Sequence, residues 1–330
     1  MPNILTIGGK NVADIQIGGK TVANIFDNTH SVLLWEKASA EPDYFYFEDR
    51  SGSANSVTLT KAGSATEWLS LEYSTDKSTW TSWDFSQSLA IAANGRVYLR
   101  GDSGRTATSS SNTHTFSSTG NVYAGGNAVT LVSATSGVQG VNLNHAFCHL
   151  FNGMTTLVGV NTGLFDGIDT VDTGTFRETF GGCSNLANVP DLEITGIAAN
   201  ASDSFRSCFY QCSTLTTAAS IALRFTVTYT RTLYQMFTGC THLVTGADIA
   251  DIGTLGTNAL QALYSGCTSL TSIEVGFDDW GDGSATSNWT RNINTVGTFH
   301  CPSMLPSTMN SSDNVTVANY IPYNWTVENI

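Results

Sequence analysis

The stretch Phe176-Arg-Glu-Thr-Phe180-Gly-Gly-Cys183-Ser-Asn-Leu186 decides the fold, because four variants of it occur elsewhere between residues 147 and 273. The second aromatic residue of the five copies stands at positions 151, 180, 209, 237 and 264, so the steps are 29, 29, 28 and 27 residues. A period of this length, with apolar residues held in frame, is typical of a solenoid. A solenoid offers a surface for binding, so the repeat favours a binding protein over an enzyme.

Within each copy the first apolar residue and the second aromatic residue are four positions apart. Residues four apart share one face of a helix, so this spacing predicts a short helical turn in every coil. The copies end in Leu-x-x-apolar, as in Leu270-Thr-Ser-Ile273, which is typical of the strand of a leucine-rich repeat. We predict a mainly β chain with a leucine-rich-repeat solenoid, one strand and one short helix per coil, over residues 141–276, and a C-terminal cap over residues 277–330.

Four of the seven cysteines hold one position of the repeat, where the first copy carries Met154. Methionine forms no disulfide and no thiolate ligand, so a position shared by cysteine and methionine is an apolar core position. An odd number of cysteines also fits poorly with a disulfide framework. We expect reduced thiols stacked inside the solenoid at Cys183, Cys212, Cys240 and Cys267.

The segment 1–37 contains a second repeat, with a period of 10 residues, in which Gly-Gly stands between alternating apolar residues. This pattern predicts consecutive β-hairpins. Such short arms cannot bury a core, so we expect the segment to pair with a partner protein or with copies of itself. The residues expected to dock are Ile7, Ile17, Val22 and Trp35.

Six short strand signals, separated by Gly, Asn, Asp and Ser, occur within residues 38–102 and predict a small β-sandwich. Residues 103–140 are rich in Ser, Thr and Gly, so we expect a connector to the solenoid there. Trp80, Trp83 and Tyr98 could form an aromatic platform for sugars, although core packing of at least one Trp is favoured in so small a sandwich.

The motif aromatic-x-Gly-Cys-x-x-Leu-x-x-apolar resembles the BspA-type leucine-rich repeats over residues 145–277, although the third copy has Gln211 in place of Gly. The ending Gly297-Thr-Phe…Trp325-Thr-Val is similar to the ending of such proteins. Parts of residues 71–101 resemble the small β-domain that often precedes these repeats in phage and prophage proteins. The Ile-Gly-Gly-Lys repeats resemble the start of phage tail and fibre proteins. The resemblance implies a virion protein that docks by its N-terminus and displays a repeat domain.

The chain of 330 residues carries 14 Lys and Arg against 27 Asp and Glu, a net charge of −13. Nucleic acids and anionic membranes attract clustered basic residues, and here these are scattered along the sequence, so we expect neither partner. We also expect no membrane insertion, because no apolar stretch is long enough to span a bilayer. The first residues lack the features of a secretion signal. We expect synthesis in the host cytoplasm and release in the virion.

Two fragments imitate metal sites. His145, Cys148 and His149 could lie together on one helical turn as zinc ligands, but the other copies do not repeat them. Asp278 and Asp282 partly fit a calcium loop, in which an oxygen ligand is then missing at the third position. No pair of carboxylates suited to general acid–base chemistry stands out. We therefore expect a non-enzymatic protein without a metal or cofactor.

These observations predict a phage tail fibre or related appendage that recognises a glycan or protein on the host surface. A decoration or structural protein of the phage head or tail and a bacterial surface adhesin stay open as alternatives. Solenoids bind through exposed residues of the strand face. In the Leu-x-x-apolar frame the candidates for receptor contact are Asn188, Thr217, Thr245, Ser272 and Glu274.

Overall fold

The computed structural model describes residues 43–63, 70–103, 106–133, 141–225, 229–249, 255–281, 283–306 and 320–330, and the backbone of six short strands before residue 43. The chain divides into two units, Met1–Asp43 and Tyr44–Ile330. The described residues are mainly β, and their helical content is the four-residue 3-10 helix η1 (Ala128–Leu131). None of their helices is long and apolar enough to cross a membrane.

The strands of the first unit form three separate antiparallel pairs. The pairs are β1 (Thr6–Ile7) with β2 (Lys10–Asn11), β3 (Gln16–Ile17) with β4 (Lys20–Thr21), and β5 (Asn24–Phe26) with β6 (Leu33–Glu36). The first two pairs flank the Gly-Gly dipeptides of the ten-residue repeat, where the sequence predicts hairpins.

The second unit begins with two sheets that together form its β-domain. Their strands are β7 (Phe45–Asp49), β8 (Asn55–Lys61), β9 (Leu71–Ser74), β10 (Thr81–Ser82), β11 (Leu89–Ile91), β12 (Arg96–Gly101), β13 (Ala107–Ser109), β14 (Asn112–Ser118) and β15 (Val122–Gly125). One sheet has the order β10-β9-β12-β7-β15 and the other the order β11-β8-β14-β13. Phe45 and Phe47 on β7 contact Phe116 on β14, with ring centroids 5.9 and 5.0 Å apart, so the two sheets share one apolar core.

Strands β13–β15 and helix η1 lie in residues 103–140, for which the composition predicts a connector. Strand β14 pairs with β8, and β15 pairs with β7. These partners are distant in sequence, and local composition carries no signal for such long-range pairing. The two-sheet domain therefore continues beyond residue 102.

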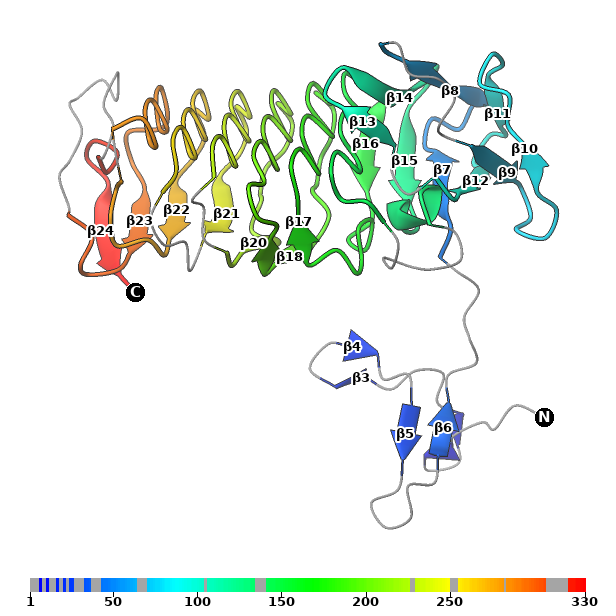
Figure 1. Ribbon diagram of the computed structural model, residues 1–330, viewed down its shortest axis with the longest axis horizontal. Coiled ribbons are helices and arrows are strands. Elements are labelled where there is room, and N and C mark those ends of the chain that lie inside the picture. The colour runs from blue at the N-terminus through cyan, green and yellow to red at the C-terminus, as the bar shows by residue number, and fades with distance from the viewer. Residues whose placement is uncertain are drawn as a thin grey trace. The chain divides into compact units, whose positions relative to one another are not determined.

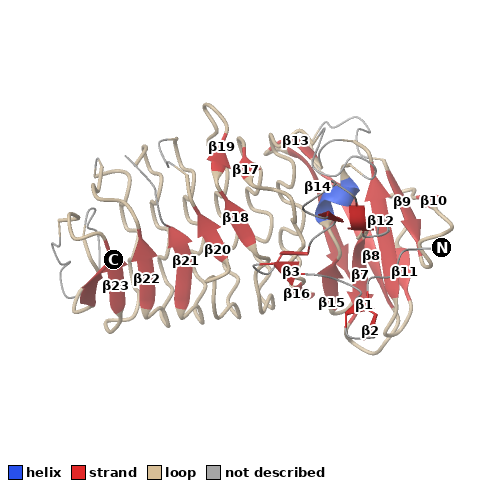
Figure 2. Ribbon diagram, turned by 90° about the horizontal axis from the view of Figure 1, so that it is seen from below, coloured by secondary structure: helices blue, strands red, loops and turns tan. Residues whose placement is uncertain are grey.

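The coils extend the larger sheet of the β-domain. Strand β16 (Leu157–Val160) of the first coil pairs in parallel with β15 (Figures 1 and 2). A parallel sheet in chain order follows, made of β18 (Leu192–Ile194), β20 (Ile221–Leu223), β21 (Thr245–Ile249), β22 (Ser272–Val275), β23 (Thr298–Cys301) and β24 (Thr326–Asn329). A smaller parallel pair consists of β17 (Thr170–Val171) and β19 (Gly196–Ile197). Residues 170–329 thus form a β-solenoid of about five turns.

Opposite the strands, each coil runs through consecutive turns where the sequence predicts a short helix. Alternate N–H groups bond within the coil, as Cys148 N to His145 O at 3.2 Å, and the others bond to the next coil, as Phe147 N to Thr175 O at 3.0 Å. Every fourth residue has a positive φ, for example 60° at His149. An α-helix would keep its hydrogen bonds within one segment, so these residues are not helical. The four-residue spacing of the apolar residues in each copy is therefore the spacing of these turns.

The apolar residues of the repeat stack in rows inside the coils. Neighbouring rings of the second aromatic position are 5.2–5.6 Å apart between centroids, and all are fully buried: Phe151, Phe180, Phe209, Phe237 and Tyr264. Each ring packs on its equivalent in the next coil, so the period of the sequence becomes a continuous aromatic core.

The repeated cysteines form a second buried row and are free thiols, as the sequence predicts. Each S–H donates to the carbonyl oxygen of the aromatic residue one coil earlier, as Cys240 Sγ does to Phe209 O at 3.0 Å. Burial raises the pKa of Cys183 and Cys240 to about 12. These thiols stay protonated at neutral pH and serve as core side chains.

Tryptophan residues close the C-terminal end of the core. Trp289 is fully buried, and Tyr264 N donates to its carbonyl oxygen at 2.7 Å, as Phe237 N donates to Leu263 O one coil earlier. The buried indole of Trp280 donates to Pro306 O at 2.9 Å, and that of Trp325 to Asn294 O at 2.8 Å. The region expected to be a cap also supplies β23 and β24, so it extends the parallel sheet.

Candidate binding surfaces

The solenoid presents two kinds of surface. The strand face is formed by the outward side chains of β18 and β20–β24. The turn face is formed by the turns of the first five coils, which span residues 145–154, 174–183, 203–212, 231–240 and 258–267. Because the coils stack in register, a residue type repeated at one position becomes a row along either face.

A row of hydroxyl side chains runs along the strand face. Thr217 pairs with Thr245, and Thr245 pairs with Ser272, so three of the predicted contact residues lie side by side. The row continues through Thr298 and Thr326. Thr217 is exposed and Thr245 and Ser272 are half-buried, so the row offers hydroxyl groups on a flat sheet.

An acidic row lies beside the hydroxyl row. Glu274 is exposed and pairs with Asp248 on one side and with His300 on the other. Asp248 accepts a hydrogen bond from Arg224 Nη1 at 3.0 Å, and His300 Nδ1 lies 3.4 Å from Glu328. The fourth predicted strand-face residue, Glu274, therefore lies among other titratable side chains.

Asn188 has a different role from the one expected. Its amide nitrogen donates to Val160 O at 2.6 Å, and its oxygen accepts from Val160 N at 3.1 Å. Both ends of this half-buried amide are thus bonded to the backbone of the preceding coil. Asn188 joins two coils and lies outside the hydroxyl and acidic rows.

The predicted docking residues lie in the first unit. Ile7 belongs to β1, Ile17 to β3 and Trp35 to β6. Val22 lies outside the described residues. The three strands belong to three separate sheets.

The two fragments that imitate metal sites are arranged differently in the structure. Cys148 is fully buried, and burial raises the pKa of its thiol to about 12, while His149 lies 3.5 Å from Glu178. Asp278 is exposed, and Asp282 lies outside the described residues. Within the described residues, no three His, Cys, Asp or Glu side chains gather as a metal site.

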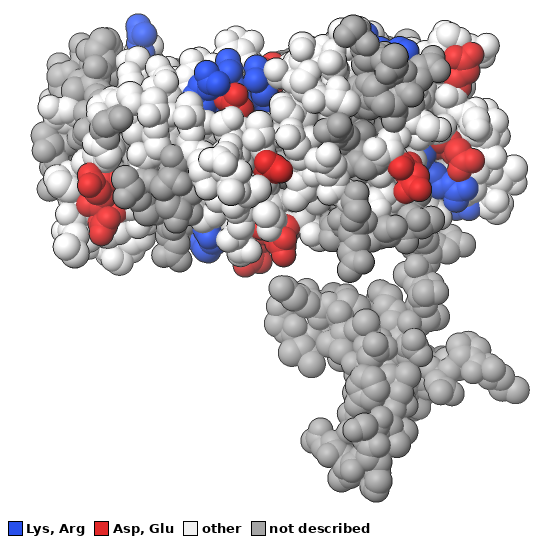
Figure 3. Space-filling model, viewed as in Figure 1, with Lys and Arg blue, Asp and Glu red and all other residues white. Residues whose placement is uncertain are grey.

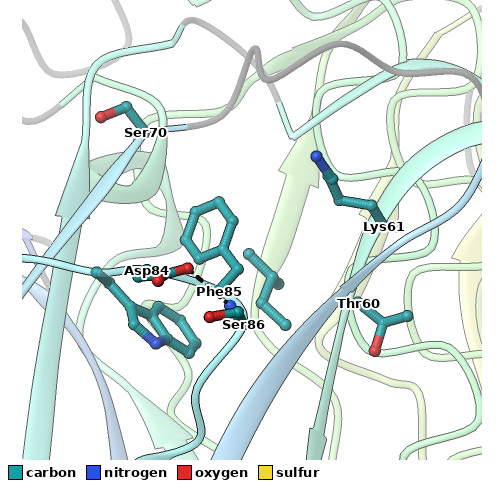
Figure 4. A pocket seen from close by; sticks show the side chains of 8 residues that line it. Thr60, Lys61, Ser70, Asp84, Phe85 and Ser86 are labelled. Atoms are coloured by element: carbon teal, nitrogen blue, oxygen red, sulfur yellow. Dashed lines mark hydrogen bonds between the residues drawn. The ribbon is translucent and has the colours of Figure 1, made fainter.

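The β-domain contains a pocket of about 810 Å³ near its aromatic core (Figure 4). Its lining includes Lys61, Trp83, Asp84 and Phe85. Asp84 accepts a hydrogen bond from Ser86 N at 3.0 Å, and this bond lowers the pKa of Asp84. The arrangement presents one carboxylate held by a turn, without a second acid or base paired to it in the described lining.

The three aromatic residues considered for a sugar platform do not share one surface. Trp83 is buried and stacks on Phe116, with ring centroids 6.3 Å apart. Trp80 is half-buried under the guanidinium of Arg100, 4.1 Å from its ring centroid, and Tyr98 lies under the ammonium of Lys77 at 4.8 Å. Core packing accounts for Trp83, and cation–π contacts cover the other two rings.

The turn face carries a charged cluster absent from the predicted site residues (Figure 3). Asp203, only 7% exposed, accepts hydrogen bonds from Arg231 at 2.9 and 3.1 Å. Arg177 lies 3.5 Å from Asp203 and 3.3 Å from Glu178, and Arg206 lies 3.7 Å from Asp203. Three guanidinium groups thus share two carboxylates, which leaves a formal charge of +1 on a chain whose net charge is −13.

A signal for this cluster exists in the sequence. Arg177 and Arg206 each follow the first phenylalanine of their copy and are 29 residues apart, which is the period of the repeat. Aligning the copies would stack the two arginines, whereas counting along the chain makes the basic residues look scattered.

Comparisons with known proteins identify no relative, since no protein-family model, curated protein or solved structure matches this chain.

Proposed function

We propose that this chain is a non-enzymatic phage virion protein, a tail fibre or related appendage, that docks by its N-terminal segment and presents the coils to the host surface. The coils are assigned to the BspA-type leucine-rich repeats as part of this proposal, on the aromatic-x-Gly-Cys-x-x-Leu motif. The virion is the proposed location, and a cell-surface glycan or protein is the proposed partner.

The stacked rows of the strand face are the observation that carries the proposal. Thr217, Thr245 and Ser272 repeat a hydroxyl group from coil to coil, and Glu274 adds a carboxylate beside them. A rigid parallel sheet fixes these groups before a ligand arrives, which lowers the entropy cost of binding. A flat row of small polar groups suits a glycan chain or a flat protein epitope.

The organisation of the chain supports the docking role. The first unit, Met1–Asp43, is separate from the unit that contains the coils. Its strands form three separate two-stranded sheets, and isolated two-stranded hairpins are marginally stable in water. Pairing with another virion protein, or with copies of itself, would supply the missing neighbours.

Binding of the labelled full chain to susceptible cells tests the proposal. The chain should bind these cells and compete with infection by particles that carry it. The triple variant Thr245→Ala, Ser272→Ala and Glu274→Gln should bind on the order of a hundredfold more weakly, because three hydrogen bonds of about 1 kcal/mol each are lost.

A control variant carries the same kinds of change in the β-domain: Ser88→Ala, Thr115→Ala and Asp102→Asn. It should bind cells as the unchanged chain does. Absence of both binding and competition would reject host recognition and favour a structural or decoration role on the particle. Equal losses in the two variants would reject the strand face as the contact surface.

A further inference from the structure

We infer that a groove on the turn face binds an acidic saccharide, at a site distinct from the strand face. The groove has a volume of about 370 Å³ and crosses the first four coils. Pockets that bind small ligands have volumes of about 300–1,000 Å³. Its lining includes Asn152, Glu178, Arg206, Tyr210, Gln211 and Gln235.

One outward position of the second coil that lines the groove has no side chain. The five copies carry Asn152, Gly181, Tyr210, Thr238 and Ser265 at this position. A Cβ atom on Gly181 would lie 3.0 Å from Asn152 Nδ2 and 3.3 Å from Ser207 O. The glycine therefore lets the side chain of Asn152 lie close over the second coil, where its Nδ2 donates to Glu178 O at 3.3 Å.

The third coil supplies an aromatic wall. Gln211 stands where the other four copies have glycine, and it adopts the left-handed conformation with φ of 57°. Its side-chain amide donates to the hydroxyl oxygen of Tyr210 at 3.2 Å and steadies that ring. Aromatic rings stack on the C–H faces of pyranose sugars, so Tyr210, which lines the groove, is suited to hold a sugar ring there.

Arg206 provides the charge that selects an acidic ligand. Its buried Nε has no hydrogen-bond partner among the described residues, and its contact with Asp203 is 3.7 Å long. Arg231 already occupies both oxygens of Asp203 at shorter distances. The guanidinium of Arg206 lies 5.2 Å above the ring of Tyr234, which fixes its plane. The Arg206 side chain is 27% exposed and lines the groove, and a planar guanidinium matches a carboxylate or phosphate group.

The acidic residue of the groove does not cancel this preference. Glu178 lies 3.3 Å from the guanidinium of Arg177, so its charge already has a basic partner. Its remaining acceptor capacity suits sugar hydroxyl groups, as do the amides of Asn152 and Gln235. The groove thus combines a cation, an aromatic ring and several hydroxyl partners, which is the set an acidic saccharide requires.

Calorimetric titration of the full chain tests the inference with three probes of equal length: a galacturonate trimer, a phosphorylated maltotriose and neutral maltotriose. At least one acidic probe should bind more tightly than maltotriose, and added salt should weaken it. Arg206→Gln should lower the affinity for that probe about tenfold. The matched change Arg224→Gln, on the strand side of the coils, should leave the affinity unchanged.

Gln211→Gly gives a second test that restores the glycine of the other copies and so preserves the fold. It should weaken the acidic probe by releasing the ring of Tyr210. The preferred acidic probe identifies the anion as carboxylate or phosphate. Failure of both acidic probes, equal binding of maltotriose, or equal affinities of the Arg206 and Arg224 variants would overturn the inference. These titrations use no cells, so their outcome does not decide the proposed host recognition, which the cell-binding experiment tests.

Discussion

A single hydroxyl group distinguishes the ring of the fifth coil from the four phenylalanines in the same row. Tyr264 Oη accepts a hydrogen bond from Ala247 N at 3.1 Å, and both residues are buried. Gly246 beside it has no side chain, and a Cβ there would lie 2.6 Å from the hydroxyl oxygen. The hydroxyl therefore satisfies a backbone donor that no water reaches.

Tyr264→Phe should lower the free energy of unfolding by about 1–3 kcal/mol, because Ala247 N loses its acceptor while ring packing is kept. Urea unfolding of the full chain measures the change. Tyr234→Phe removes a hydroxyl on the half-buried turn face and should change stability by less than about 0.5 kcal/mol. Equal stability of the Tyr264 variant and the unchanged chain would contradict the role given to this bond.

The cysteine row shows what a shared position can and cannot predict. The exchange of cysteine with Met154 predicts burial, and the structure confirms it for Cys183, Cys212, Cys240 and Cys267. It does not predict that each thiol donates to a carbonyl of the preceding coil. Methionine has no S–H, so the comparison that revealed the core position hides the hydrogen bond.

At the scale of the element, the coil explains why a correct period led to a wrong local structure. An i, i+4 pair of apolar residues lies on one face of an α-helix. A chain of four-residue turns with a positive φ at every fourth residue produces the same spacing. Glycine marks this position in Gly153, Gly182, Gly239 and Gly266, but His149 and Glu178 adopt the same conformation without such a mark. The sequence therefore predicts the repeat unit but does not distinguish a helical backbone from a series of four-residue turns.

The coil is also the unit that the chain should tolerate losing. Deletion of residues 209–236 removes one complete step of 28 residues, from Phe209 to the residue before Phe237. Neighbouring coils then meet with their aromatic and cysteine rows in frame, so the product should fold with a cooperative but weaker unfolding transition. Thermal unfolding followed by circular dichroism measures it.

Deletion of residues 209–222, half of the same step, is the control for this prediction. It brings a strand position against a turn position and should abolish cooperative unfolding. Similar unfolding of the two shortened chains would show that the coils are not interchangeable units.

At the scale of the whole molecule, the parts with local signals were the easier to predict. The period of the repeat predicts the solenoid, and the Gly-Gly dipeptides predict the hairpins. The β-domain depends on pairing between β8 and β14 and between β7 and β15, segments far apart in sequence. The charged cluster on the turn face depends on stacking of Arg177, Arg206 and Arg231 from separate coils. Local composition does not encode the long-range strand pairing, and the stacking of Arg177 on Arg206 becomes visible only when the copies of the repeat are aligned.

The division into two units predicts that docking and folding are separable. Deletion of residues 1–43 removes the first unit and leaves the compact second unit intact. The shortened chain should unfold at the same temperature as the second unit of the full chain. It should also keep its binding to cells, because both candidate surfaces belong to the coils.

The same shortened chain should not be incorporated into particles, because it lacks the strand pairs of the first unit that are proposed to bind another virion protein. Quantitative immunoblotting of purified particles measures this loss. The double variant Ile7→Asp and Ile17→Asp places a charge in β1 and in β3 and should lower incorporation without changing the unfolding temperature. Normal incorporation of the shortened chain would refute docking through the first unit, whereas a lowered unfolding temperature would show that the first unit stabilises the second.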